Sequence, residues 1–254
     1  MATYKKKGGK VRKTQISSIE DHSTTAEVFN TLDETASKSE QWVEKHQRKI
    51  LIALSVIALV ILGSIAYNNY VIEPKEKEAA DELAFPKQSF EQAQSATVSA
   101  DSLFTIALNG ADGKYGLLDI IDNYGKTKAG NLAKYMSGIS YLKLSDYENA
   151  IKYLNDFSSE DEMLGSLALG NIGDAFIEIN QPKDALDYYK KAANFKDNSF
   201  TTPLYLFKAG NTAMELDKYS DALSMFERIK NDYNTSEEAK QIDVFIERAK
   251  LANK

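Results

Sequence analysis

The pattern of hydrophobic and polar positions changes most sharply at residues 50–72. This stretch reads ILIALSVIALVILGSIAYNNYVI and holds no charged side chain, whereas polar segments precede and follow it. A helix over these residues is about 34 Å long, and the hydrocarbon core of a membrane is about 30 Å thick. A cleaved signal peptide would begin near residue 1, and a helix apolar on all sides is unusual in a soluble core. The pattern therefore predicts an uncleaved transmembrane helix.

The segment before this helix divides into two parts. Residues 24–49 show a helical spacing of apolar positions, which predicts an amphipathic juxtamembrane helix. Such a helix rests on a membrane surface or docks a partner, although the narrow stripe fits a weakly ordered helix equally well. Residues 1–23 hold a basic run between Lys5 and Lys13 and few apolar side chains. We expect a disordered tail that binds anionic lipid or RNA, or that only helps to set the topology.

Positive charge is concentrated before the apolar stretch. Residues 1–49 carry a net charge of +3, and residues 50–254 carry a net charge of −9. Lysine and arginine beside a transmembrane helix favour the cytoplasmic side. We therefore expect a cytoplasmic N-terminus and residues 73–254 on the other side of the membrane, with the reversed orientation as the alternative. The acidic C-terminal part is poorly suited to nucleic acid, because phosphate contacts need a basic surface.

Three segments in the C-terminal part repeat one pattern at intervals of 35 and 37 residues. Each segment has a glycine, then an alanine, then a large side chain at the same spacing. These residues are Gly138, Ala150 and Leu154; Gly173, Ala185 and Tyr189; and Gly210, Ala222 and Phe226. Small residues let two helices approach closely, and large ones fill the gaps between helix pairs. Because the period is near the roughly 34 residues of tetratricopeptide repeats, residues 131–165, 166–202 and 203–235 resemble three such repeats.

The remaining segments complete an all-α chain, in which one N-terminal transmembrane helix precedes a tetratricopeptide-repeat-like α-solenoid. Residues 236–252 are predicted to form a capping helix over the last repeat. Upstream, we expect helices at 76–94, 103–108 and 116–124, with the first broken or kinked at Pro86. Asp101 or Ser102 is expected to cap the second of these helices, and Thr127 the helix that follows them.

Catalytic chemistry has little support in the sequence. Cysteine is absent, and both histidines, His22 and His46, precede the apolar stretch. The carboxylate pairs Asp161–Glu162 and Glu237–Glu238 fall at predicted helix starts, where acidic residues favour the helix dipole. We therefore expect no catalytic, metal or cofactor site. An enzyme that uses only Asp, Glu, Lys and Tyr is the remaining alternative.

A protein-binding groove is the expected site, because the first helix of each pair lines the concave surface in this class of repeat. The candidates are Tyr135, Ile139, Leu142 and Lys143 in the first repeat, Leu167, Asp174, Ile177 and Glu178 in the second, and Leu204, Phe207, Asn211, Met214 and Glu215 in the third. These residues are mostly apolar with acidic residues at one edge. They suit an extended or helical apolar segment, such as a nascent chain. Alternatively, the chain's own helix at 76–94 fills the groove.

The whole arrangement is similar to the YfgM-type family of bacterial inner-membrane proteins. The resemblance covers roughly residues 40–254, with GDAFIEINQPKDALDYYKKA as its best local match, and the segment GNLAKYMSGISYL suggests a Bacteroidetes-type variant. It implies a periplasmic repeat domain that associates with the SecYEG translocon and a periplasmic folding factor and assists translocation or early folding. A scaffold for cell-wall or outer-membrane assembly is the rival interpretation.

Overall fold

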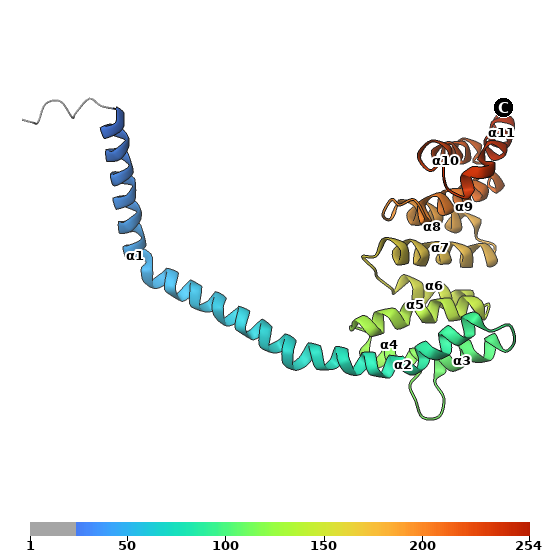
Figure 1. The fold of residues 1–254 in the computed structure, drawn as a ribbon, viewed down its shortest axis with the longest axis horizontal. Helices are drawn as coiled ribbons and strands as arrows, with labels where there is room; N and C mark the ends of the chain where they lie inside the picture. The colour runs from blue at the N-terminus through green and yellow to red at the C-terminus, as the bar shows by residue number, and fades with distance from the viewer. Residues whose placement is uncertain (1–23) are drawn as a thin grey trace, which may run out of the picture. The chain divides into compact units, whose positions relative to one another are not determined.

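The computed structural model describes residues 24–254, and describes side chains from Trp42 onward. The tail expected at 1–23 lies outside these residues. Within them the chain is all-helical, with eleven α-helices, two short helices of other types and no strand (Figure 1). The all-α fold is therefore confirmed. The chain divides into two compact units between Asn68 and Asn69.

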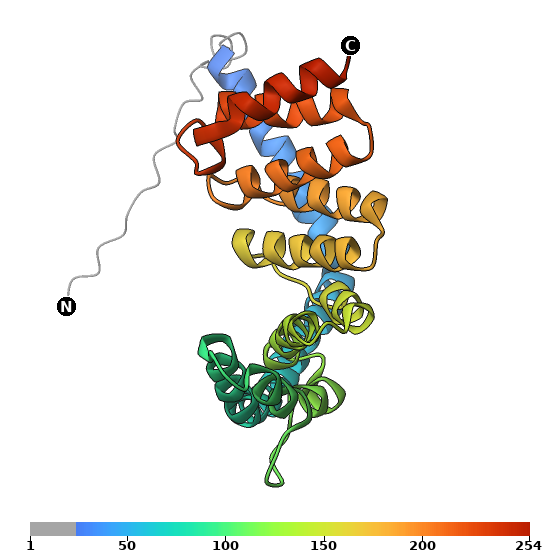
Figure 2. The ribbon, with the colours of Figure 1, turned by 90° about the vertical axis from the view of Figure 1, so that its right-hand side faces the viewer.

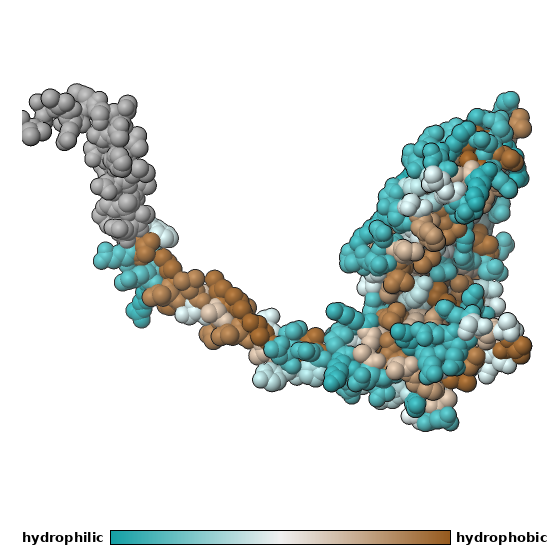
Figure 3. All heavy atoms as spheres, in the orientation of Figure 1, coloured by the Kyte–Doolittle hydropathy of each residue, from teal (hydrophilic) through white to brown (hydrophobic). Residues whose placement is uncertain are grey.

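The first unit is built on α1 (Thr24–Tyr67), which joins the two helices predicted at 24–49 and 50–72. The helix passes residue 50 without a break, because no proline, glycine or capping residue interrupts it there. Large apolar side chains such as Leu51, Leu59 and Val60 are exposed on α1, and Figure 3 shows hydrophobic residues along the later part of this helix. This helix is long and apolar enough to cross a membrane.

A short π-helix, η1 (Asn68–Ile72), follows α1 and precedes α2 (Glu73–Ser95). The apolar stretch therefore ends in a change of helix type within its predicted range. Pro74 lies in the first turn of α2, directly after the π-helix. Pro86 lies inside α2, which continues past it, so the helix is not broken there, and the alternative of a kink stays a prediction. Pro86 is buried where α2 packs against the following helices, and this burial offsets the lost hydrogen bond.

Two short helices, α3 (Ala100–Asn109) and α4 (Leu117–Tyr124), follow α2. The caps expected for α3 at Asp101 or Ser102 are wrong, because the helix begins earlier, after Ser99 in the left-handed conformation. The loop between the two helices contains a tight Asp112–Gly113 turn in which both residues have positive φ. Lys114 N donates to Ala111 O at 2.9 Å across this turn, and Asp-Gly is the favoured sequence for such a turn.

Each predicted repeat forms one helical hairpin. The pairs are α5 (Lys128–Lys143) with α6 (Tyr147–Asn155), α7 (Glu162–Glu178) with α8 (Pro182–Asn194), and α9 (Thr201–Glu215) with α10 (Tyr219–Asp232). Thr127 caps α5 as expected, accepting a hydrogen bond from Gly130 N at 2.9 Å. Each helix packs against the next, and Figure 2 shows them stacked in chain order.

The three hairpins turn in the same way. Ser145, Asn180 and Asp217 occupy equivalent positions with φ of 59°, 57° and 58°. In each turn the next backbone N–H donates to a carbonyl near the end of the first helix. These bonds join Asp146 to Tyr141 at 2.9 Å, Gln181 to Phe176 at 2.8 Å and Lys218 to Ala213 at 2.8 Å. This Schellman arrangement satisfies carbonyls that the helix end would leave unpaired.

The capping segment differs from the single helix expected at 236–252. It consists of a 3-10 turn, η2 (Glu238–Gln241), and α11 (Ile242–Ala252). Ser236 accepts a hydrogen bond from Ala239 N at 3.2 Å and so begins the segment as expected. Ile242, Ile246 and Ala249 are buried against α10 and close the hydrophobic core at this end.

Helix α2 packs against α3, α4 and α5. Its side chains Ala79, Leu83 and Phe90 belong to the same buried cluster as Ile139 of α5. The chain's own helix therefore covers part of the first repeat. It does not line the pockets beside the second and third repeats described below.

Candidate protein-binding groove

Two adjacent pockets lie beside the second and third hairpins. The larger, of about 740 Å³, lies between α7, α9 and the η2–α11 segment, and the smaller, of about 270 Å³, lies beside α5, α6 and α7. Ile177 and Tyr189 line both pockets. We therefore treat them as one feature, the repeat groove, which is lined by Leu142, Tyr147, Asp174, Ile177, Glu178, Tyr189, Leu204, Phe207, Lys208, Asn211, Thr212, Glu215, Glu237, Glu238, Lys240, Gln241 and Phe245.

Apolar side chains line the centre of the larger pocket. The ring of Phe207 lies 4.8 Å from that of Phe245 in an edge-to-face arrangement and 6.1 Å from that of the buried Phe226. Edge-to-face contacts stabilise aromatic pairs beyond simple burial, so these rings hold α9, α10 and α11 together. Ile177 of α7 is 36% exposed and presents apolar surface to the groove without a large role in the core.

A polar cluster joins three helices where the two pockets meet. The Tyr189 hydroxyl of α8 donates to Asp174 of α7 at 2.5 Å. Lys208 of α9 donates to both Asp174 oxygens, at 2.7 and 2.8 Å. Burial, followed by this bond to Asp174, raises the pKa of Tyr189 above its ordinary value. Tyr189 is therefore protonated at neutral pH, which suits a structural brace and not a general base.

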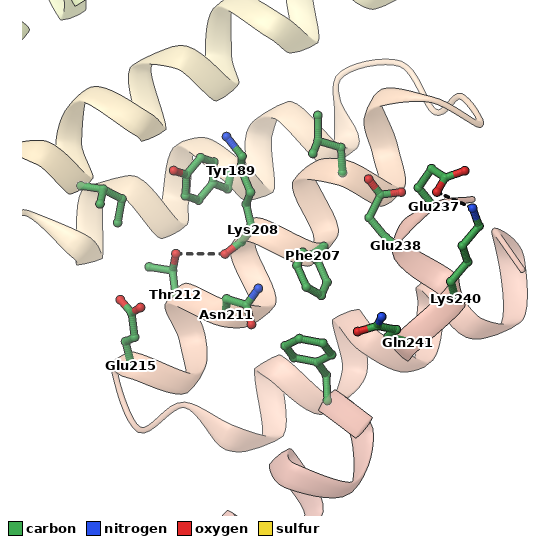
Figure 4. A pocket seen from close by; sticks show the side chains of 13 residues that line it. Tyr189, Phe207, Lys208, Asn211, Thr212, Glu215, Glu237, Glu238, Lys240 and Gln241 are labelled. Atoms are coloured by element: carbon green, nitrogen blue, oxygen red, sulfur yellow. Dashed lines mark hydrogen bonds and ion pairs between the residues drawn. The ribbon is translucent and has the colours of Figure 1, made fainter. Parts of the chain in front are cut away.

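Carboxylates surround the apolar centre. Figure 4 shows Glu215 at one end of the larger pocket and Glu237 and Glu238 at the other, with Phe207 between them. Lys240 forms an ion pair with Glu237. In the smaller pocket, Glu178 accepts a long hydrogen bond from the Tyr147 hydroxyl at 3.4 Å. The rim of the groove is thus predominantly acidic.

The structure brings most of the predicted groove residues together. Those that line the repeat groove are Leu142, Asp174, Ile177, Glu178, Leu204, Phe207, Asn211 and Glu215. Leu142 lies on α5, and the others lie on α7 and α9, so all of them belong to the first helices of the three hairpins.

The other predicted residues lie elsewhere. Ile139 is buried in the core cluster that includes α2. Tyr135 packs against Phe157 with ring centroids 5.2 Å apart, and Lys143 is exposed at the end of α5. Met214 and Leu167 pack against the second core cluster. The position of Ile139 follows from α2, which packs against α5. Leu167 and Met214 lie in the second and third repeats, which α2 does not pack against, and they face the core between those hairpins.

The sequence did not predict that the capping segment, η2 and α11, forms one wall of the larger pocket. Glu237, Glu238, Lys240, Gln241 and Phe245 line the larger pocket because η2 and α11 lie beside α9. The sequence predicted a capping helix over residues 236–252, but it did not indicate that this segment turns back to line the groove. The Glu237–Glu238 pair therefore lines the groove as well as beginning a helical turn.

The other carboxylate pair, Asp161–Glu162, lies at a helix start, as expected. Asp161 caps α7 and accepts hydrogen bonds from Met163 N at 3.0 Å and Leu164 N at 2.8 Å. Among residues described from Trp42 onward, no three His, Cys, Asp or Glu side chains are grouped so as to hold a metal ion.

Comparison with known protein families finds the tetratricopeptide repeat at residues 132–161 and 205–236. The chain contains tetratricopeptide repeats. The two matches fall on the α5–α6 and α9–α10 hairpins, and the α7–α8 hairpin between them has the same turn geometry. No curated protein matches the chain. Repeats of this kind indicate a scaffold for protein–protein interaction, with the repeat groove as the candidate surface.

Proposed function

We propose that this protein is a membrane-anchored scaffold that binds a segment of another protein in the repeat groove. One observation carries the proposal. A groove with exposed apolar side chains lies on a tetratricopeptide array, in a chain that also has a helix able to cross a membrane. The proposed binding is noncovalent, and the Tyr189–Asp174–Lys208 cluster serves in it as a brace between α7, α8 and α9.

The proposed setting is the bacterial inner membrane, with the repeats in the periplasm and the SecYEG translocon as the membrane partner. The resemblance of residues 40–254 to the YfgM-type family supports this setting, and the basic residues before α1 support the orientation. There the scaffold assists protein translocation or early folding by holding an emerging chain or a periplasmic folding factor. The apolar centre of the groove suits a segment that has not yet buried its own apolar side chains.

Chemical crosslinking in intact membranes, followed by mass spectrometry, tests the partner. We expect crosslinks between the repeat hairpins and translocon subunits. The variant Ile177→Lys should remove them, because it places a charge on an exposed apolar position of the groove. Ser224→Lys on the exposed side of α10 adds the same charge outside the groove and should leave them unchanged. Crosslinks to cell-wall or outer-membrane assembly proteins without translocon subunits would contradict the proposed setting.

Protease digestion of spheroplasts tests the orientation. The proposed topology places residues 73–254 outside the cytoplasmic membrane, so the protease should degrade the repeats while a cytoplasmic control protein survives. Repeats protected until detergent is added would contradict that orientation.

A further inference from the structure

We infer that the repeat groove selects a polypeptide segment in which lysine or arginine adjoins large apolar side chains. This inference rests on the proposed function, because it names the chemistry of the segment that the scaffold binds.

The charges of the groove are unequal. Its lining has five carboxylates and two lysines, which are Asp174, Glu178, Glu215, Glu237, Glu238, Lys208 and Lys240. Both lysines already have partners inside the groove. Lys208 lies 2.7 Å from Asp174, and Lys240 pairs with Glu237.

Three carboxylates remain uncompensated. Glu178, Glu215 and Glu238 form no ion pair with any residue from Trp42 onward. A ligand entering the groove therefore meets negative potential from both pockets. Because part of the surroundings is apolar, this potential is screened less than it would be in bulk water. A basic side chain gains from it, and an acidic segment is repelled.

The apolar and acidic groups are arranged for simultaneous contact. Phe207 lies between the carboxylates of Glu215 and Glu238 in the larger pocket (Figure 4). An apolar side chain seated on Phe207 and Phe245 would place its sequence neighbours near one of these carboxylates. Arg248 already lies over the Phe245 ring, with its guanidinium carbon 6.0 Å from the ring centroid. The carboxylates, and not this ring, are therefore the groups that attract a basic side chain of the ligand.

The extent of the groove favours a polypeptide over a small molecule. The two pockets follow one another along the hairpins, and Ile177 and Tyr189 are common to both. The basic run at Lys5–Lys13 has similar chemistry within this chain. It precedes the transmembrane helix, however, and so lies across the bilayer from the repeats in the proposed topology. A partner protein is therefore the occupant that we assign.

Peptide binding to the full-length protein in lipid nanodiscs tests the inference. The probes are three fluorescent peptides of equal length in which leucine and phenylalanine alternate with lysine, glutamine or glutamate. We expect the lysine peptide to bind at least about tenfold more tightly than the glutamate peptide, with the glutamine peptide between them. Added salt should weaken the lysine peptide most.

Removal of the free carboxylates should reduce this preference. Glu215→Gln and Glu238→Gln should each weaken the lysine peptide about two- to fivefold, as expected for partly exposed ion pairs, and the double variant about tenfold. Glu227→Gln is the matched control, because Glu227 is exposed on α10 and does not line the groove. It should leave the affinity unchanged.

Several outcomes would overturn the inference. Equal binding of the lysine and glutamine peptides, or preference for the glutamate peptide, would disprove charge selection while leaving a groove that binds protein segments. Tighter binding of the lysine peptide after deletion of residues 1–23 would make the chain's own tail the occupant. If none of the peptides binds, the inference fails. The effect of Ile177→Lys on the membrane crosslinks then decides the proposed function separately.

Discussion

Gly173 lies directly against Tyr189, its partner on the second helix of the same hairpin. A Cβ atom added to Gly173 would lie 2.6 Å from Cε1 of the Tyr189 ring. The same relationship joins Gly138 to Leu154 and Gly210 to Phe226. These are the three pairs that the repeated spacing singled out in the sequence. Each hairpin is therefore closed by a glycine that admits one large side chain.

The closeness of Gly210 to Phe226 predicts a large cost for one added methyl group. Phe226 is fully buried, so its ring cannot move without disturbing the core. Gly210→Ala should lower the free energy of unfolding by about 1–3 kcal/mol, measured by urea denaturation.

A double variant separates overpacking from a general effect on the helix. Phe226→Leu replaces the aromatic ring by a smaller side chain, so Gly210→Ala should cost less in that background than in the natural chain. Equal costs in the two backgrounds would show that Gly210 does not serve to admit Phe226.

The raised pKa of Tyr189 predicts a loss of stability at alkaline pH. The folded protein holds this tyrosine neutral through burial and its bond to Asp174, whereas in the unfolded chain it titrates near pH 10. The contribution of Tyr189 to the free energy of unfolding is therefore complete below about pH 10 and is lost as the pH rises further. Burial raises the pKa of Tyr205 in the same direction.

Comparing the stability of the natural protein with that of the Tyr189→Phe variant isolates the contribution of Tyr189. At neutral pH the variant should be less stable, because it lacks the bond to Asp174. The difference should shrink as the pH rises above about 10, where tyrosine ionises in the unfolded chain, since phenylalanine does not ionise. A difference that stays constant over this range, measured by thermal unfolding, would rule out a contribution from Tyr189 ionisation.

The left-handed turn residues predict a stabilising substitution. Ser145 has a φ of 59°, which is unfavourable for a residue with a Cβ atom. Ser145→Gly should raise the free energy of unfolding by about 0.5–1 kcal/mol after the entropy of glycine is allowed for. Ser224→Gly, at an exposed position inside α10, should lower it by about 0.5 kcal/mol. Destabilisation by Ser145→Gly would contradict the role assigned to this turn.

The hairpins were predictable because their contacts are local. Gly210 and Phe226 meet within one repeat, so their spacing in the sequence reports their packing directly. The turns were only partly predictable, since Ser145, Asn180 and Asp217 adopt a conformation that usually signals glycine. The uninterrupted α2 was not predictable, because the burial of Pro86 depends on how α2 packs against α3, α4 and α5.

The residues of the repeat groove were also only partly predictable from the sequence. Ile177 and Phe207 could be placed from the alignment of the repeats, because each lies on the first helix of its hairpin. Glu238 and Phe245 could not, because their place in the groove depends on the return of the last segment beside α9. Ile139 was assigned to the concave face, yet α2 packs there and its side chain is in the core.

The apolar stretch itself can be tested as an anchor. Among the residues described from Trp42 onward, no neighbour lies within 4 Å of a Cβ added at Gly63. Replacement of residues 50–72 by an unrelated apolar span of equal length should leave partner crosslinking unchanged, measured in intact membranes. Loss of the partner with the repeats still folded would show that the span forms part of the interface.

A photo-crosslinking amino acid at position 177 tests the central claim most directly. Ile177 borders both pockets and is exposed, so a partner in the repeat groove must lie beside it. Irradiation of cells should give a discrete adduct of higher mass from position 177, and none from position 224 on the exposed side of α10. The absence of an adduct at 177, or equal adducts at both positions, would contradict binding in the groove.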